Sequence, residues 1–123
     1  MPTILVVDDE WAIADWLEAI LSDVGYRVFV ASNGLEALNV LENEEIQLVI
    51  SDFMMPFVDA PALMRTMKAE TRTANIPVII ITALQEQTVS QRLEGYRTVL
   101  RKPFRESELL EAVTNVLGPI GPD

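Results

Sequence analysis

Cysteine and histidine are both absent from the 123 residues of this chain. Without cysteine, the chain can form no disulfide bond, no thiolate zinc site and no iron–sulfur cluster. Without histidine, it has no imidazole to bind a metal or to serve as the base of a serine hydrolase triad. The remaining possibilities are hard-metal chemistry on carboxylates, phosphoryl chemistry, or no chemistry at all.

Basic side chains are also scarce, with 9 lysines and arginines against 19 aspartates and glutamates, so the formal charge is −10. A negative field opposes binding to nucleic acids and to anionic membranes, and we expect this domain to contact neither directly. No apolar run approaches the roughly 20 residues of a membrane-spanning helix. The N-terminus lacks the charged region of a signal peptide, and we therefore expect a cytoplasmic location.

Short apolar runs rich in β-branched residues alternate along the chain with longer amphipathic stretches. The runs that favour strands cover residues 4–7, 28–31, 48–50, 77–81 and 99–100. The stretches with helical spacing cover residues 11–24, 35–44, 63–67, 84–93 and 109–117, and residues 53–61 are expected to form a loop. This alternation predicts one α/β domain over residues 1–118 with a parallel sheet, followed by a tail or the start of a linker at 119–123.

Charged and hydroxyl side chains follow four of the five expected strands: Asp8 with Asp9, then Asp52, Thr82 and Lys102. Each has an ordinary structural explanation when taken singly, such as a helix cap or a solvated lysine. In an open α/β sheet, however, the carboxyl ends of the strands meet at one edge, where ligands bind. Crowded carboxylates repel one another, and a hard divalent cation, Mg²⁺ or Mn²⁺, would compensate that repulsion. A carboxylate, a metal, an ammonium and a hydroxyl together make a phosphoryl-transfer site.

With these residues in this order, the sequence resembles the receiver domain of two-component response regulators from Thr3 to about Leu117. The motifs that carry the resemblance are Ile4–Glu10 (ILVVDDE), Ser51–Asp52 with Met55–Pro56, Ile81–Ala83 (ITA) and Lys102–Phe104 (KPF). The resemblance implies a flavodoxin-like (βα)5 fold, a three-layer sandwich whose parallel sheet has the strand order 2-1-3-4-5. It also implies a signalling domain and not a metabolic enzyme.

The resemblance assigns a role to each residue at the strand ends. Asp52 becomes the phosphoacceptor, and Thr82 and Lys102 contact the phosphoryl oxygens. Asp8, Asp9 and Asp52 hold Mg²⁺ together with the backbone carbonyl of Met54. The phosphoryl donor is the phosphohistidine of a sensor histidine kinase or of a histidine phosphotransfer protein. Because this chain has no histidine, that donor must lie in another protein or outside these 123 residues. The readout would be an output domain or a separate target protein, and a homodimer is a further expectation.

The sequence departs from the family pattern around the fourth helix. The family usually has tyrosine or phenylalanine three residues before the site lysine, as a switch residue that moves with the threonine, but this chain has Val99. Tyr96 lies close by in sequence. Thr82 and Lys102 are 20 positions apart, slightly fewer than is usual in the family. We therefore predict that the helix at 84–93 is short, shifted or mobile.

Two apolar residues occupy positions that flank the phosphoryl group in the family, Met54 and Leu84. Neither side chain can orient an attacking water by hydrogen bonding. The resemblance therefore predicts a slow loss of the phosphoryl group.

Three other functions compete with a phosphorylated receiver. A receiver-like binding module that works without phosphorylation stays an alternative because of the altered switch position, although the intact acid pair, Asp52, Thr82 and Lys102 argue against it. An aspartate-nucleophile phosphatase typically has an Asp-x-Asp motif after its first strand, whereas this chain has Asp8-Asp9-Glu10. A flavin carrier would need a hydroxyl-rich phosphate loop there, and the same acidic residues would repel a phosphate.

Overall fold

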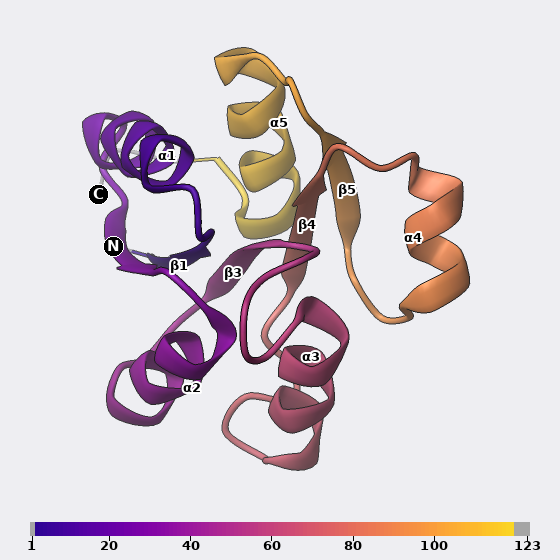
Figure 1. Ribbon diagram of the computed structural model, residues 1–123. Coiled ribbons are helices and arrows are strands. Elements are labelled where there is room, and N and C mark those ends of the chain that lie inside the picture. Colours follow the sequence, from indigo (N-terminus) through magenta and orange to yellow (C-terminus); the bar gives the residue numbers. More distant parts are fainter. Residues whose placement is uncertain (1, 120–123) are drawn as a thin grey trace.

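The computed structural model describes residues 2–119 and shows a parallel sheet between two layers of helices (Figure 1). The elements are β1 (Thr3–Val7), α1 (Trp11–Asp23), β2 (Arg27–Ala31), α2 (Gly34–Asn43), β3 (Leu48–Asp52), α3 (Ala60–Ala69), β4 (Val78–Thr82), α4 (Glu86–Arg92), β5 (Thr98–Arg101) and α5 (Glu106–Leu117). All strand pairs are parallel, and the order is β2-β1-β3-β4-β5. The predicted α/β class and strand order are confirmed. Of the expected tail, residues 120–123 lie outside the described residues.

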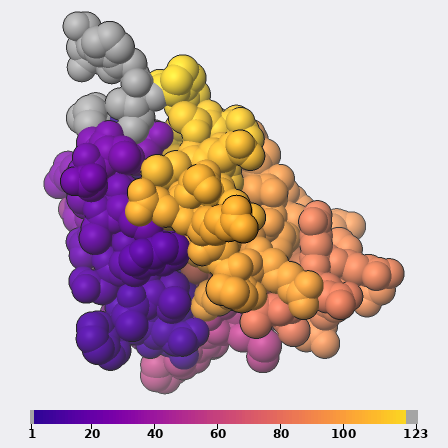
Figure 2. Space-filling view, turned by 90° about the horizontal axis from the view of Figure 1, so that it is seen from above, coloured from indigo at the N-terminus to yellow at the C-terminus, as the bar shows by residue number. Residues whose placement is uncertain are grey.

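The central strands β1, β3 and β4 are buried along their whole length because helices cover both faces of the sheet. Alternate residues of a strand point to opposite faces, so Leu5 and Val7 join one core while Ile4 and Val6 join the other. The first core lies under α2, α3 and α4, and the second lies under α1 and α5. Figure 2 shows α1 and α5 side by side on one face of the molecule.

The loop from β3 to α3 is fixed at both ends. Asp59 caps α3 by accepting a hydrogen bond of 3.0 Å from the N–H of Ala62. On its other side, the loop packs against the start of α2, where a Cβ added to Gly34 would lie 2.1 Å from the carbonyl oxygen of Val58. Only glycine allows this approach, so the loop that follows Asp52 rests directly on α2.

Two helices begin earlier than the apolar spacing predicts. The expected loop at 53–61 ends sooner, because Ala60 and Pro61 form the first turn of α3, a position that proline tolerates. Helix α5 starts at Glu106, where the side chain of Glu108 accepts a hydrogen bond of 2.9 Å from the N–H of Arg105. In both cases polar capping extends the helix beyond its apolar stripe.

Helix α4 has only 7 residues and is shorter than the predicted stretch at 84–93. Its one buried residue is Val89, and no side chain caps its first turn. The predicted shortness is confirmed. Within residues 2–119, no helix has the length and apolarity that crossing a bilayer requires.

Candidate functional site

Lys102 is surrounded by three carboxylates at the carboxyl edge of the sheet. Its Nζ lies 3.1 Å from Oδ2 of Asp8, 3.3 Å from Oε1 of Glu10 and 3.7 Å from Oδ2 of Asp52. Asp8 is 1% exposed and Asp52 is 9% exposed, whereas Glu10 is open to solvent. A buried pair of acids therefore shares one ammonium with a third acid at the surface.

The parallel sheet brings these side chains together. The register pairs Val7 of β1 with Ser51 of β3, so the residues that follow, Asp8 and Asp52, lie side by side. Lys102 follows β5, and its backbone N–H donates to the carbonyl oxygen of Thr82 at 2.7 Å. Residues that are far apart in sequence thus meet at one edge because three strands end there.

The electrostatics of the site oppose the charge on Asp52. Burial raises the pKa of Asp52 to about 6; the Lys102 ammonium pulls it down, and the charges of Asp8 and Asp9 push it up. Burial also acts to lower the pKa of Lys102, but attraction to Asp52, Asp8 and Glu10 outweighs it, so that pKa is raised. Lys102 therefore stays cationic, and one ammonium compensates only part of the negative charge around Asp52.

The donor set fits a hard divalent cation. One carboxylate oxygen from each of Asp8, Glu10 and Asp52 lies within 4.8 Å of the others. Oxygen ligands of this kind suit Mg²⁺. The partly compensated charge on Asp52 gives such an ion a favourable place to bind.

Glu10 is the residue of this cluster that the sequence interpretation missed. Asp9, which the resemblance assigns to the metal, is exposed and lies outside the group of three, although its charge acts on the pKa of Asp52. The available signal was Asp8 itself, because an aspartate side chain commonly accepts a hydrogen bond from the backbone N–H two residues later. Here Oδ1 of Asp8 accepts from the N–H of Glu10 at 2.9 Å, which keeps Glu10 beside Asp8.

The other residues singled out from the sequence lie on β4, on β5 and in neighbouring loops. Thr82 is buried at the end of β4, and its hydroxyl oxygen accepts a hydrogen bond of 3.1 Å from the N–H of Leu84. Leu84, Val99 and Tyr96 are all partly buried and pack against the core under α4. Met54 is exposed in the loop after β3. The structure therefore gathers Thr82 with Lys102 and leaves Val99 within the strand, opposite Ile80.

Comparison with known proteins identifies the family of this fold and site. The family described as response regulator receiver domain matches residues 4–114. "Response regulator Rre1" of Synechocystis sp. is 36% identical over 94% of this chain and 51% of its own length. "Sporulation initiation phosphotransferase F" of Bacillus subtilis is 36% identical over 93% of this chain and 92% of its own length.

Solved structures agree with these sequence matches. The receiver domain of the sensor histidine kinase PA1611 from Pseudomonas aeruginosa, with a magnesium ion coordinated in its active site cleft, is 28% identical with a TM-score of 0.85, over 96% of this chain and 98% of that one. A response regulator of Chloroflexus aurantiacus is 30% identical with a TM-score of 0.87, over 97% of this chain and all of that one.

The chain spans about half the length of several curated relatives, 52% of a probable transcriptional regulator of Pyropia yezoensis being one example. The match to the family covers nearly the whole chain and includes the acidic edge of the sheet. The chain therefore belongs to the response regulator receiver domain family, whose members are signalling domains and not classical enzymes.

Proposed function

We propose that this domain accepts a phosphoryl group on Asp52 from the phosphohistidine of a sensor histidine kinase or a histidine phosphotransfer protein. The observation that carries the proposal is the buried Asp52 carboxylate, which lies 3.7 Å from the Lys102 ammonium beside two further acids. Because the chain contains no histidine, the donor belongs to another protein or to a segment outside these 123 residues.

The transfer is an in-line displacement at phosphorus. A carboxylate oxygen of Asp52 forms the new P–O bond, and the P–N bond to the donor imidazole breaks with its electron pair returning to the ring nitrogen. Lys102, held in place by Asp8 and Glu10, neutralises charge on the phosphoryl oxygens. The product is an acyl phosphate on Asp52.

We also propose that this transfer depends on Mg²⁺ or a similar divalent cation. When bound, the ion neutralises charge on the phosphoryl oxygens. Asp8, Glu10 and Asp52 would hold it, with the backbone carbonyl of Met54 as a further ligand. Asp9 is an additional proposed contributor, since its charge acts on Asp52.

The switch we propose starts at Thr82. Its hydroxyl oxygen accepts a bond from Leu84, and its own proton is available to a phosphoryl oxygen on Asp52. Turning toward that oxygen would break the bond to Leu84, which packs in the same core as Val99, Tyr96 and the α4 residue Val89. With valine at position 99, Leu84 becomes the link from the site to α4, and α4 becomes the element that a target protein, an output domain or a second copy reads.

We expect the phosphoryl group to be lost slowly. Met54 is apolar and exposed next to the site, and Leu84 is apolar beside Thr82, so neither can orient a water molecule for attack on phosphorus. The measurement is the rate of phosphate release after the donor is removed. Substituting Met54→Asn should accelerate the release, and an unchanged rate would contradict this role.

The central experiment is labelling with acetyl phosphate and Mg²⁺, followed by intact-mass measurement. The wild-type chain should gain one phosphoryl group, and Asp52→Asn should gain none. Asp15→Asn, an exposed position on α1, is the matched control and should label like the wild type. Equal labelling of the Asp52 variant would contradict the assignment.

A second candidate is a binding module that works without phosphorylation, and the observation that favours it is Val99 at the usual aromatic position. The same experiment separates the two functions. A wild-type chain that binds Mg²⁺ but takes no label would favour the second.

A further inference from the structure

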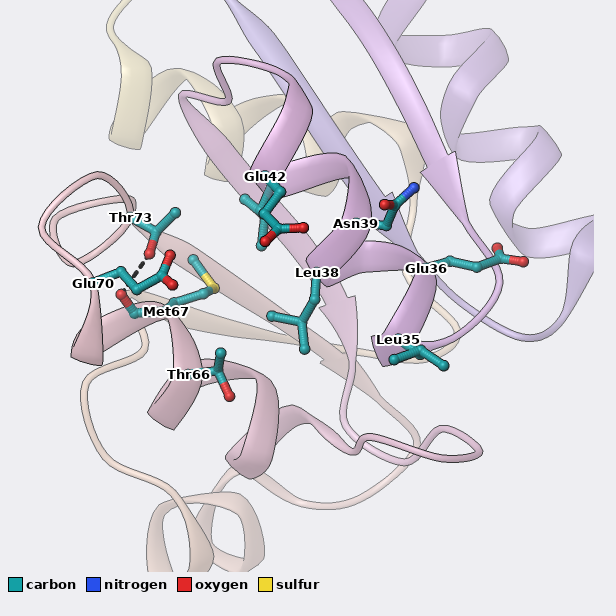
Figure 3. A pocket seen from close by; sticks show the side chains of 10 residues that line it. Leu35, Glu36, Leu38, Asn39, Glu42, Thr66, Met67, Glu70 and Thr73 are labelled. Carbon is teal, nitrogen blue, oxygen red and sulfur yellow. Dashed lines mark hydrogen bonds between the residues drawn. The ribbon is translucent and has the colours of Figure 1, made fainter.

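Helices α2 and α3 lie side by side on one face of the sheet, and a groove of about 520 Å³ runs between them (Figure 3). Its floor is apolar and consists of Leu35, Leu38, Leu41 and Met67. Leu41 and Met67 are buried, whereas Leu35 is 60% exposed at the open end. The groove is separate from the acidic edge described above, because none of the residues that surround Lys102 lines it.

The charged side chains of this groove all carry the same sign. Glu36, Glu42 and Glu70 line it, and among the described residues no lysine or arginine does. In Figure 3, Glu42 and Glu70 lie near one end of the groove and Glu36 lies near the other. Because Glu36 and Glu42 are six residues apart on one helix, their backbones are separated by about 9 Å along its axis.

Two basic side chains that follow lining residues in the sequence, Arg72 and Lys68, are turned to other partners or to another side. The guanidinium of Arg72 donates to the backbone carbonyls of Glu42 and Glu44, at 3.1 and 3.4 Å. Lys68 lies on the other side of α3, where a Cβ added to Gly95 would come within 2.8 Å of its Nζ. Among the described residues, no lysine or arginine of α2 or α3 therefore lines the groove beside these carboxylates.

The hydroxyl groups of the groove are also engaged within their own helix or turn. Thr66 donates to the carbonyl of Ala62 at 3.1 Å, and Thr73 donates to the carbonyl of Met67 at 2.6 Å. Both hydrogen bonds that the Glu36 carboxylate accepts, from the N–H and the hydroxyl of Ser32, go to Oε1, which leaves Oε2 for a partner. The groove thus offers apolar surface and carboxylate acceptors.

We propose that this groove binds an amphipathic helix of a partner protein that places leucine-like side chains between lysine or arginine residues. The apolar side chains would cover Leu35 and Leu38, as in other complexes where a helix lies in a groove. The flanking cations would pair with Glu36 at one end and with Glu42 and Glu70 at the other. Opposite charges at the rim fix the orientation of such a helix, and the apolar floor holds it.

The chain itself does not supply an equivalent helix within residues 2–119. Helix α3 carries Arg65 and Lys68 and no acid, but it is itself one wall of the groove. Helix α5 packs on the opposite face of the sheet, so a segment that followed Pro119 would start on the far side. These placements favour a separate partner over a second copy or a tethered segment.

The probe for this inference is a fluorescent peptide of about 15 residues, long enough to form a helix on binding. It carries leucines at helical spacing flanked by lysines, and a peptide of the same composition in scrambled order is the control. Binding is followed by fluorescence anisotropy, and its position by amide chemical shifts in NMR. We expect the ordered peptide to bind at least about tenfold more tightly than the scrambled one and to shift amides of α2 and α3.

Matched variants test the two parts of the surface separately. Leu35→Ser should weaken binding, whereas Val30→Ser, an exposed apolar position on β2, should not. Glu42→Lys with Glu70→Lys should weaken binding far more than Glu94→Lys with Glu111→Lys, which changes the net charge equally at exposed positions away from the groove. Equal effects of the two charge pairs, or equal binding of the scrambled peptide, would overturn the proposal.

Two further measurements complete the test. Asp52→Asn should bind the peptide like the unphosphorylated wild type, since neither Asp52 nor its neighbouring acids line the groove, so this inference and the proposed function can fail separately. Sedimentation equilibrium tests the competing occupant. Self-association that Leu35→Ser abolishes would assign the groove to a second copy and overturn the partner helix.

Discussion

The acidic edge and the α4–β5 region are held in place to very different degrees. The acids of the edge stand on β1 and β3, whose residues are all buried, and only their shared ammonium, Lys102, comes from the end of β5. Helix α4, by contrast, has one buried residue, Val89, and no side-chain cap, and β5 is an edge strand that is only partly buried. The phosphoacceptor and its neighbouring acids therefore lie on the most deeply buried part of the sheet, and the proposed readout lies on the least buried part.

This difference matters because the two regions have opposite requirements. Transfer of a phosphoryl group needs charges fixed in position before the reaction. A switch needs an element whose two arrangements differ little in free energy, and such elements come from the parts of a protein with few buried contacts. The bond from Leu84 to the Thr82 hydroxyl is the point where the rigid region meets the loose one.

Removing the ammonium should have the largest effect on the rigid side. Lys102→Met leaves Asp8, Glu10 and Asp52 without their common cation, and we expect the rate of labelling by acetyl phosphate to fall by about 100-fold or more. The initial rate, followed by intact mass, is the measurement. Lys68→Met, the other lysine of the chain, should label normally. If the labelling rate of the Lys102 variant falls by less than about twofold, the ammonium has no significant role in the transfer.

The raised pKa of Asp52 predicts how stability depends on pH. Because this pKa is about 6 in the folded chain and 3.8 as a free group, the folded state holds the proton more tightly, and the contribution of Asp52 to stability falls as pH rises from about 4 to about 6. Asp52→Asn should remove this decrease. In a buffer whose chelator removes divalent cations, it should raise the free energy of unfolding at pH 7 by at most about 3 kcal/mol. Urea denaturation at pH 4, 6 and 7 measures it.

Magnesium provides the control for the pH experiment. If the ion binds among these carboxylates, it should restore the stability of the wild type at pH 7 and leave Asp52→Asn nearly unchanged. If the stability of the wild type relative to Asp52→Asn does not fall between pH 4 and pH 7 in chelator, the raised pKa of Asp52 is contradicted.

The loose side of the comparison can be tested by hydrogen exchange. Amides of α4 should exchange by local opening, with a lower opening free energy than those of β1 and β3, because Val89 is the one buried residue within the helix. The measurement is the dependence of the exchange rates on urea. Equal opening free energies in α4 and β3 would show that the two regions unfold together.

The smallest effect is expected where the two regions meet. Thr82→Ala removes the acceptor for the Leu84 N–H and should lower stability by about 1 kcal/mol, as for a single hydrogen bond. Asp52 should still accept label, but the chemical shifts of α4 should no longer respond to it. Thr82→Ser should preserve the response, since it keeps the hydroxyl. A full response in the alanine variant would exclude Thr82 as the link.

The sequence predicts the fold and most of the acidic edge because both depend on short-range patterns. Continuous apolar runs mark buried parallel strands, and the residues that end them, such as Asp52 and Lys102, must lie at one edge. Glu10 escaped because a choice between neighbouring acids depends on the direction of each side chain. The starts of α3 and α5 escaped because caps such as Asp59 extend a helix past its apolar stripe.

The groove between α2 and α3 could not be predicted from the sequence. Leu35 and Leu38 have the spacing of a core-facing stripe, and only the packing of the two helices decides that Leu35 remains exposed. The distance between neighbouring helices depends on all the side chains between them. Sequence spacing therefore indicates which face of a helix is apolar, but not how much of that face the neighbouring helix covers.

Gly34 connects the groove to the acceptor loop mechanically. It precedes Leu35, and its Cα touches Val58 so closely that a methyl group could not be inserted. A displacement of the first turn of α2 must therefore push or release the loop that follows Asp52. If a ligand in the groove moves that turn, it changes the equilibrium for phosphorylation of Asp52 by some factor, and phosphorylation must then change the affinity of the groove by the same factor.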